Sequence, residues 1–135
     1  VIDTGCRDTT SQRAALFISD IYLLPFNPRS FDVWTVGKVE KLIMEIRAVR
    51  PTELLAFSFI NRADARGSDN NDAAELLAQS EVMEYLEMPL GNRKAFSHAA
   101  AKGLGVTELL PVDEKAVYEL TSLFNRVLSH IDASI

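Results

Sequence analysis

The chain has 135 residues and a mass of 15.0 kDa, which suits one domain with a single core. Apolar residues make up 47% and charged residues 24%, a composition that excludes an intrinsically disordered chain. The net charge of −5 does not favour broad affinity for nucleic acid, although it leaves room for a local basic patch. The single cysteine excludes an intramolecular disulfide, and no apolar run approaches the roughly 18 residues of a membrane span. We therefore expect a single domain over residues 1–135.

The chain begins with signals for a strand, a helix and a second strand. Val1-Ile2 indicates the end of a strand that starts upstream. Residues 8–11 offer several helix-capping side chains before an expected helix over residues 12–19. The run 21–26 is almost wholly apolar, which is typical of a strand buried on both faces of a parallel sheet.

The next segments repeat this alternation. Apolar residues three and four apart predict a helix from Asp32, as its cap, to about Arg50, and Pro51 ends it. Residues 54–60 then form a second apolar run, which predicts another buried strand.

The second half of the chain is richer in helices. Asp72 and Glu75 resemble a capping box for a helix to about Gln79, and a short strand is expected near Met88. Residues 92–102 predict a helix ended by a glycine, and Asp113 caps a final helix. One apolar stripe is expected on that last helix, made of Val117, Leu120, Phe124, Val127 and Ile131.

This order of elements predicts the fold class. Alternating strands and helices favour an α/β fold of three layers, with a mostly parallel sheet and helices on both faces. Fewer than five strands are expected and the first is cut at the start of the chain, so the sheet is small or N-terminally truncated.

Polar residues follow each of the three expected strands. These strand ends lie at residues 3–8, 27–30 and 61–64, and they carry carboxylates, amides and arginines. In open parallel sheets ligands bind outside the carboxyl ends of the strands. Arginine suits phosphate and a carboxylate suits Mg²⁺, so this edge is the expected site. The alternative is that these polar residues only begin surface loops.

Four segments of the chain also carry a resemblance. They are Val1-Ile2-Asp3-Thr4-Gly5, Leu24-Pro25-Phe26-Asn27-Pro28, Phe59-Ile60-Asn61-Arg62, and Arg93-Lys94-Ala95-Phe96 with Gly103, Val106 and Glu108. In this order they resemble the ParA/MinD family of partition ATPases, and the match covers nearly the whole chain. The resemblance implies a P-loop NTPase-like fold.

The resemblance also implies roles for individual residues. Asp3 would hold Mg²⁺ through water and sense the γ-phosphate, with Thr4 and Gly5 beside the phosphate. Asn61 and Arg62 would contact adenine. The structural alternatives are a capping or ion-paired Asp3, a turn glycine at Gly5, and loop capping by Asn61 and Arg62.

One defining motif of that family is missing from the sequence. The lysine-containing phosphate loop, Lys-Gly-Gly-x-Gly-Lys-Thr, does not occur in these 135 residues. We therefore expect the C-terminal portion of such a protein. It would bind neither ATP, ADP nor Mg²⁺ and would hydrolyse no ATP by itself, while the parent protein would use all three ligands. An edge left without its neighbouring strand would favour self-association.

Two classes of function follow. By resemblance, the parent is a cytoplasmic bacterial switch for plasmid or chromosome partition and needs no membrane. It would dimerise with ATP, bind DNA non-specifically and respond to a centromere-binding partner protein.

The basic residues gather in the first half of the chain. Residues 1–67 carry nine Lys/Arg and eight Asp/Glu, whereas residues 68–135 carry five Lys/Arg and eleven Asp/Glu. A DNA patch in this more basic half would use Arg47, Arg50, Arg62 and Arg66, with a solvated face as the alternative.

The second class is a non-enzymatic degenerate partner or dimerisation module of the same fold. A third hypothesis, a related synthetase that uses ATP to activate a carboxylate, has no substrate signature in the sequence. Three single residues also stand out: Arg29 as a phosphate candidate or a surface arginine, Cys6 as an acidified or inert thiol, and Trp34 as a core or subunit-contact residue.

Overall fold

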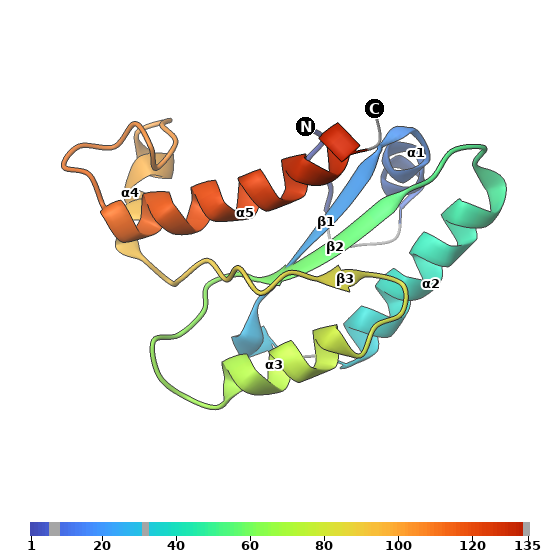
Figure 1. The fold of residues 1–135 in the computed structure, drawn as a ribbon, viewed down its shortest axis with the longest axis horizontal. Helices are drawn as coiled ribbons and strands as arrows, with labels where there is room; N and C mark the ends of the chain where they lie inside the picture. The colour runs from blue at the N-terminus through green and yellow to red at the C-terminus, as the bar shows by residue number, and fades with distance from the viewer. Residues whose placement is uncertain (6–8, 31–32, 134–135) are drawn as a thin grey trace.

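The strands of this protein form one small parallel sheet, seen in a computed structural model that describes residues 1–5, 9–30 and 33–133. The sheet has the order β1 (Ile21–Phe26), β2 (Leu55–Ile60) and β3 (Glu84–Tyr85). Both strand pairs are parallel, and Ile21 lies opposite Leu55. With the helices between the strands, the protein is α/β, as the alternation predicted (Figure 1). The roles predicted for Cys6 and for Asp32 as a cap lie outside the described residues.

Five α-helices and one short 3-10 helix accompany the sheet in the described part of the chain. Most begin and end close to the predicted positions, since their caps are local signals: Thr9 Oγ1 accepts the Gln12 N–H at 3.2 Å, and Asp113 Oδ1 accepts the Ala116 N–H at 3.1 Å. The helices are α1 (Thr10–Ile18), η1 (Pro28–Ser30), α2 (Val33–Val49), α3 (Asp69–Ala78), α4 (Lys94–Ala101) and α5 (Glu114–Ala133).

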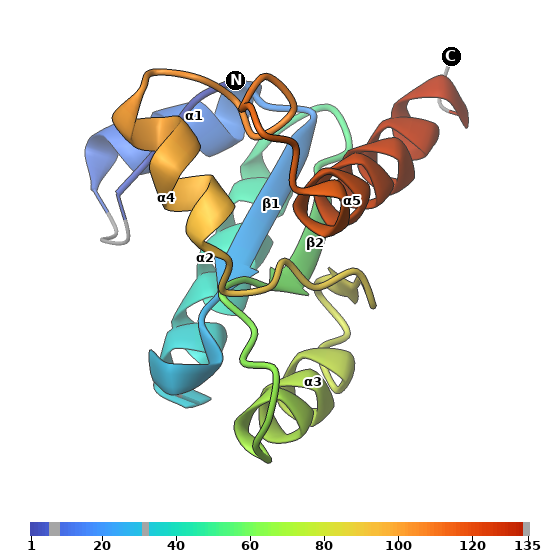
Figure 2. The same cartoon turned by 90° about the vertical axis from the view of Figure 1, so that its left-hand side faces the viewer.

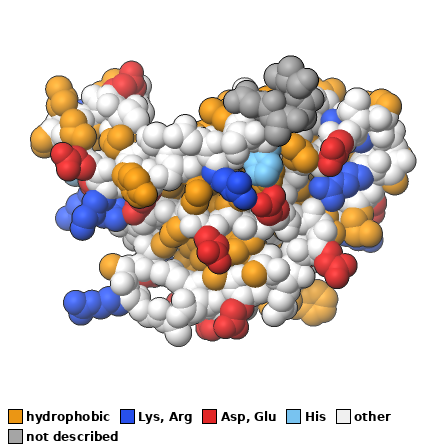
Figure 3. All heavy atoms as spheres, viewed as in Figure 1, with side chains coloured by type: hydrophobic (Ala, Val, Ile, Leu, Met, Phe, Trp, Pro, Cys, Tyr) orange, Lys and Arg blue, Asp and Glu red, His pale blue; other side chains and the backbone are white. Residues whose placement is uncertain are grey.

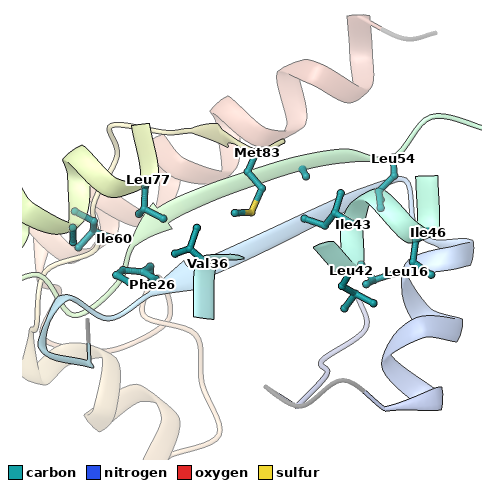
Figure 4. Packing of buried hydrophobic residues seen from close by; sticks show 12 residues of the cluster. Leu16, Phe26, Val36, Leu42, Ile43, Ile46, Leu54, Ile60, Leu77 and Met83 are labelled. Carbon is teal, nitrogen blue, oxygen red and sulfur yellow. The ribbon is translucent and has the colours of Figure 1, made fainter. Parts of the chain in front are cut away.

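Helices pack on both faces of the sheet (Figures 1 and 2). On one face, apolar side chains of α1, α2 and α3 meet those of the strands, and Figure 4 shows this packing. On the other face, Leu123 and Val127 of α5 cover Phe57 and Phe59 of β2. A third, smaller cluster joins α4 to the start of α5. No helix in the described residues combines the length and the apolarity needed to cross a membrane.

Two predictions about strands were wrong. Val1-Ile2 is not part of a strand, because none of the segments that the structure describes pairs with residues 1–5, and both side chains are exposed. The strand at residues 21–26 exists, but only Phe26 in it is buried. It is the edge strand of the described sheet, so it is covered on one side only. By contrast, β2 lies in the middle and is buried along nearly its whole length, as predicted.

Three predictions in the second half were also inaccurate. Helix α3 begins at Asp69, so Asp72 is in its first turn and does not cap it. The third strand lies at Glu84–Tyr85 and not near Met88, because it pairs with the middle of β2. Phe124 and Ile131 of the predicted stripe are 46% and 36% exposed, and the buried stripe of α5 includes Leu123 instead.

Candidate functional site

Strands β1 and β2 end at the same edge of the sheet, as predicted. The Asn61 N–H donates to the Phe26 carbonyl at 2.8 Å, which aligns the two ends. Polar side chains directly follow both strands. We call this set the carboxyl-end cluster: Asn27, Arg29, Asn61, Arg62 and Asp64. Two of the three predicted strand ends therefore meet here.

An ion pair joins the two halves of this cluster. Arg29 Nε lies 2.9 Å from Asp64 Oδ2, and Arg29 Nη2 lies 2.5 Å from Asp64 Oδ1. This two-point geometry is the strong form of an arginine–carboxylate contact. The hydrogen bonds raise the pKa of Arg29 and lower the pKa of Asp64. Arg29 is therefore occupied by a carboxylate, which the sequence did not predict because the partners are 35 residues apart.

Hydrogen bonds on both sides hold this pair in place. Asn27 Oδ1 accepts the Arg29 N–H at 3.0 Å, and Pro28 is fully buried, so η1 is anchored beside the end of β1. Asn70 Oδ1 accepts the Asp64 N–H at 3.3 Å, and Asn70 Nδ2 donates to the Asp64 carbonyl at 2.6 Å. The Arg29–Asp64 pair thus connects η1 to the start of α3.

Asn61 and Arg62 form the exposed end of the cluster. Asn61 Oδ1 accepts the Arg62 N–H at 3.0 Å. Its Nδ2 has no partner among the described residues and remains a donor. Arg62 is exposed and has a φ of 53°, the only positive φ of a non-glycine residue in the described chain. Such a conformation is uncommon for arginine, and conformations of this kind cluster at binding sites.

The N-terminal residues predicted for Mg²⁺ (Asp3) and for the phosphate (Thr4 and Gly5) lie elsewhere. Asp3 and Gly5 are exposed and Thr4 is half-buried, in a segment outside the sheet. Figures 1 and 2 place the N-terminus near the start of β1, away from the end where the cluster forms. In residues 1–5, 9–30 and 33–133, no three His, Cys, Asp or Glu side chains form a group that would hold a metal ion. The N-terminal segment that carries Asp3 therefore lies apart from Asn61 and Arg62 in this structure.

The four arginines proposed for DNA do not come together. Arg50 is only 8% exposed, and its guanidinium donates to the carbonyls of Leu16, Ser19 and Glu53. Arg47 donates to the Leu54 and Val82 carbonyls. Both precede β2, whereas Arg62 and Arg66 follow it.

The length of β2 keeps the two pairs of arginines apart, because six strand residues span about 20 Å. Arg62 and Arg66 are both exposed. On the face in Figure 3, basic side chains are scattered between acidic ones and form no continuous basic area.

The fourth segment of the resemblance has a structural role. Arg93 Nη2 lies 2.6 Å from Glu119 Oε1, and Glu119 Oε2 accepts the Gly91 N–H at 3.0 Å. Burial alone would raise the pKa of Glu119, but these hydrogen bonds lower it. Glu108 similarly accepts the Gly105 N–H at 2.7 Å. The Glu119 contacts attach the chain before α4 to α5, whereas the Glu108 contact lies within the loop between the two helices.

A hollow lies at the opposite end of the sheet. It has a volume of about 440 Å³, and its lining includes Arg47, Ser80, Glu84 and His130, near the amino ends of β2 and β3. Arg126 Nη2 contacts Glu84 Oε1 at 3.2 Å, and the ring centroids of His130 and Phe57 are 4.6 Å apart. This hollow is separate from the carboxyl-end cluster.

Comparison with known proteins leaves the family open. No model of a known protein family matches the chain, and no curated protein matches it.

Trp34, predicted to be a core or contact residue, is 79% exposed and so is not in the core.

Proposed function

We propose that this chain is the base-recognition part of an ATP-dependent partition switch of the ParA/MinD type, with a P-loop NTPase-like layering. The observation that carries the proposal is the placement of Asn61 and Arg62. Both lie at the carboxyl end of a central parallel strand, where ligands of such sheets bind. The exposed Arg62 in a left-handed conformation supports a binding role over a plain loop.

The chemistry of these two residues suits a purine base. The Asn61 amide keeps Nδ2 as a donor while Oδ1 holds the Arg62 backbone, so the donor is oriented before a ligand arrives. A guanidinium stacks on the face of a flat base. The neighbouring Arg29–Asp64 ion pair lies beside them, and Asn70 holds the Asp64 backbone in place. In this proposal Arg29 orients the site and does not bind phosphate, because Asp64 occupies it.

The proposal assigns no catalytic residue in these 135 residues. No lysine-containing phosphate loop occurs in them, so we expect no ATP hydrolysis and no ATP, ADP or Mg²⁺ binding by the chain alone. Hydrolysis, nucleotide-driven dimerisation, DNA binding and the centromere-binding partner belong to the parent protein in a bacterial cytoplasm. For DNA, Arg47 and Arg66 remain the exposed candidates, whereas Arg50 has a structural role.

The first test is the genomic reading frame upstream of the Val1 codon. A frame that encodes a lysine-containing phosphate loop supports the proposal. In the protein so encoded, Asn61→Ala and Arg62→Ala should each weaken nucleotide binding about three- to tenfold, as expected for one lost contact of roughly 1 kcal/mol. Lys102→Ala, at an exposed position on the end of α4, is the matched control. Unchanged binding in both site variants would contradict the proposal.

One observation favours the second candidate, a non-enzymatic module of the same fold. Asp3 lies outside the sheet and away from Asn61, so the two predicted halves of a nucleotide site are separate. A start codon at Val1, with no phosphate loop upstream, would support this candidate over the switch.

A further inference from the structure

The outer edge of β1 presents backbone groups that the sheet does not use. The Asp20 and Phe26 carbonyls accept from β2, at 3.1 Å from the Leu55 N–H and 2.8 Å from the Asn61 N–H. Backbone groups alternate in direction along a strand, so the even-numbered residues from 20 to 26 face β2. The N–H and carbonyl groups of Ile21 and Leu23, and the Pro25 carbonyl, therefore point away from the sheet.

No described residue pairs with this edge. The sheet order places β1 at the end of the sheet, and no hydrogen bond in the described chain involves the Ile21 or Leu23 backbone on that side. Edge strands are usually protected by charges, bulges or a cover. Strand β1 contains no charged residue, and its one protective feature is Pro25, which lacks an N–H.

The surface area of the chain indicates how much is left uncovered. A compact monomer of 15.0 kDa exposes about 7,000 Å². This chain exposes 9146 Å². The excess of about 2,000 Å² is more than the roughly 800 Å² that each partner buries in an interface of standard size. The chain thus has enough surplus surface for a stable dimer.

We propose that two copies of this chain pair through β1 to form one continuous six-stranded sheet. A two-fold axis perpendicular to the sheet makes the two β1 strands antiparallel. With Tyr22 opposite Tyr22 of the second copy, Ile21 and Leu23 exchange both hydrogen bonds with Leu23 and Ile21 of that copy. Four hydrogen bonds form, and Pro25 lies outside them, so its missing N–H costs none. A register centred on Leu23 would also keep four hydrogen bonds, but it would place Pro25 opposite Ile21 at both ends and leave both Ile21 carbonyls without a donor.

Side chains on the α5 face favour the same arrangement. Ile21 and Leu23 lie on that face and are only half-buried, and pairing sets Ile21 opposite Leu23 of the second copy and Leu23 opposite its Ile21. Phe124 and Leu128 of α5 are 46% and 49% exposed, four residues apart on one side of the helix. The axis keeps both α5 helices on the same face of the joined sheet.

This assembly stops at two copies. The same patch serves on both chains, so the contact is closed. The other edge of the sheet is β3, which has two residues, one of them Glu84, and offers a poor template for further pairing. The proposal requires no nucleotide and does not depend on the function proposed above.

Light scattering and amide exchange of the chain without nucleotide test this proposal. We expect twice the chain mass of 15.0 kDa for the wild type and for Leu23→Val, which shortens the side chain but keeps the N–H. Leu23→Pro removes only an outward-facing N–H from the backbone. The mass measured by light scattering should therefore fall from that of two chains to that of one. Circular dichroism checks that each variant is folded.

Amide exchange of the wild type decides the matter if Leu23→Pro does not fold. The Ile21 and Leu23 amides should be protected in the dimer and should become unprotected on dilution, while the Leu24 amide stays protected because it faces β2. Three results would each overturn the proposal: a wild-type monomer at the highest soluble concentration, a dimer with freely exchanging Ile21 and Leu23 amides, or a folded Leu23→Pro variant that remains dimeric. In those cases the edge is free or takes another occupant.

Discussion

Replacing Arg50 with alanine should destabilise the fold strongly, although arginine is usually a surface residue. Its guanidinium donates to the Leu16 carbonyl at 2.8 Å and the Ser19 carbonyl at 2.6 Å, at the end of α1. It also donates to Thr52 Oγ1 at 2.9 Å and the Glu53 carbonyl at 3.2 Å, in the loop before β2. One side chain therefore joins the two connections that lead into β1 and β2.

The magnitude follows from these contacts. The Leu16 hydrogen bond is buried, so its carbonyl would lose a partner that water does not replace, at a cost of about 1–3 kcal/mol. The other three hydrogen bonds of Arg50 are partly buried, so water compensates part of the loss of each. We expect a total loss of about 3 kcal/mol. For a chain of 135 residues this lowers Tm by about 10 °C.

Thermal unfolding followed by circular dichroism, at one protein concentration, measures this effect. Arg47→Ala is the matched control, because Arg47 also donates to two carbonyls but is exposed. Its loss should cost about 1 kcal/mol, less than that of Arg50, because the Val82 contact is exposed and the Leu54 contacts are only partly buried, so water compensates part of each loss. Equal Tm values for the two variants would refute the structural role of Arg50. A DNA-binding test should therefore use Arg47 and Arg66 and leave Arg50 intact.

Two further predictions concern α5. Glu119→Gln removes the negative partner of Arg93 and should cost about 1–2 kcal/mol near neutral pH. Because the folded pKa of Glu119 lies below its ordinary value of 4.5, the difference from wild type should disappear as the pH falls through the folded pKa; a constant difference from pH 7 to 3 in urea titrations would contradict this. Asp113→Ala removes the cap on the Ala116 N–H and should cost about 1 kcal/mol, measured as a shift of the urea midpoint, with Asp113→Asn as a control that keeps the cap. A midpoint for Asp113→Ala equal to that of the control would show that the cap does not stabilise α5.

Local signals in the sequence predicted most of the elements. The apolar runs at residues 21–26 and 54–60 became β1 and β2, and the helical spacing after residue 33 became α2. Gly103, with a φ of 68°, follows α4 as predicted, because glycine tolerates this conformation at a helix end. These features depend on residues within a few positions of one another, so a single sequence contains them.

Features that depend on distant partners were not predicted. The sequence placed Arg29 and Asp64 after separate strands, but only the parallel pairing of β1 and β2 brings them into contact. Val1-Ile2 has the composition of a strand end, yet a strand requires a neighbour and none pairs with it in the described chain. The start of α3 is a different case, because its signals are local: the helix begins at Asp69, before the expected cap at Asp72.

The candidate site divides in the same way. The sequence by itself determined that the chain is α/β, that its strands lie in a mostly parallel sheet, and that Asn61 and Arg62 follow the strand at residues 54–60. Only the tertiary structure decided that Arg29 is held by Asp64, that Arg50 is buried, and that β1 is an exposed edge. The physical reason is that periodicity and capping act over a few residues, whereas burial and ion pairing depend on which distant segments the sheet order makes neighbours.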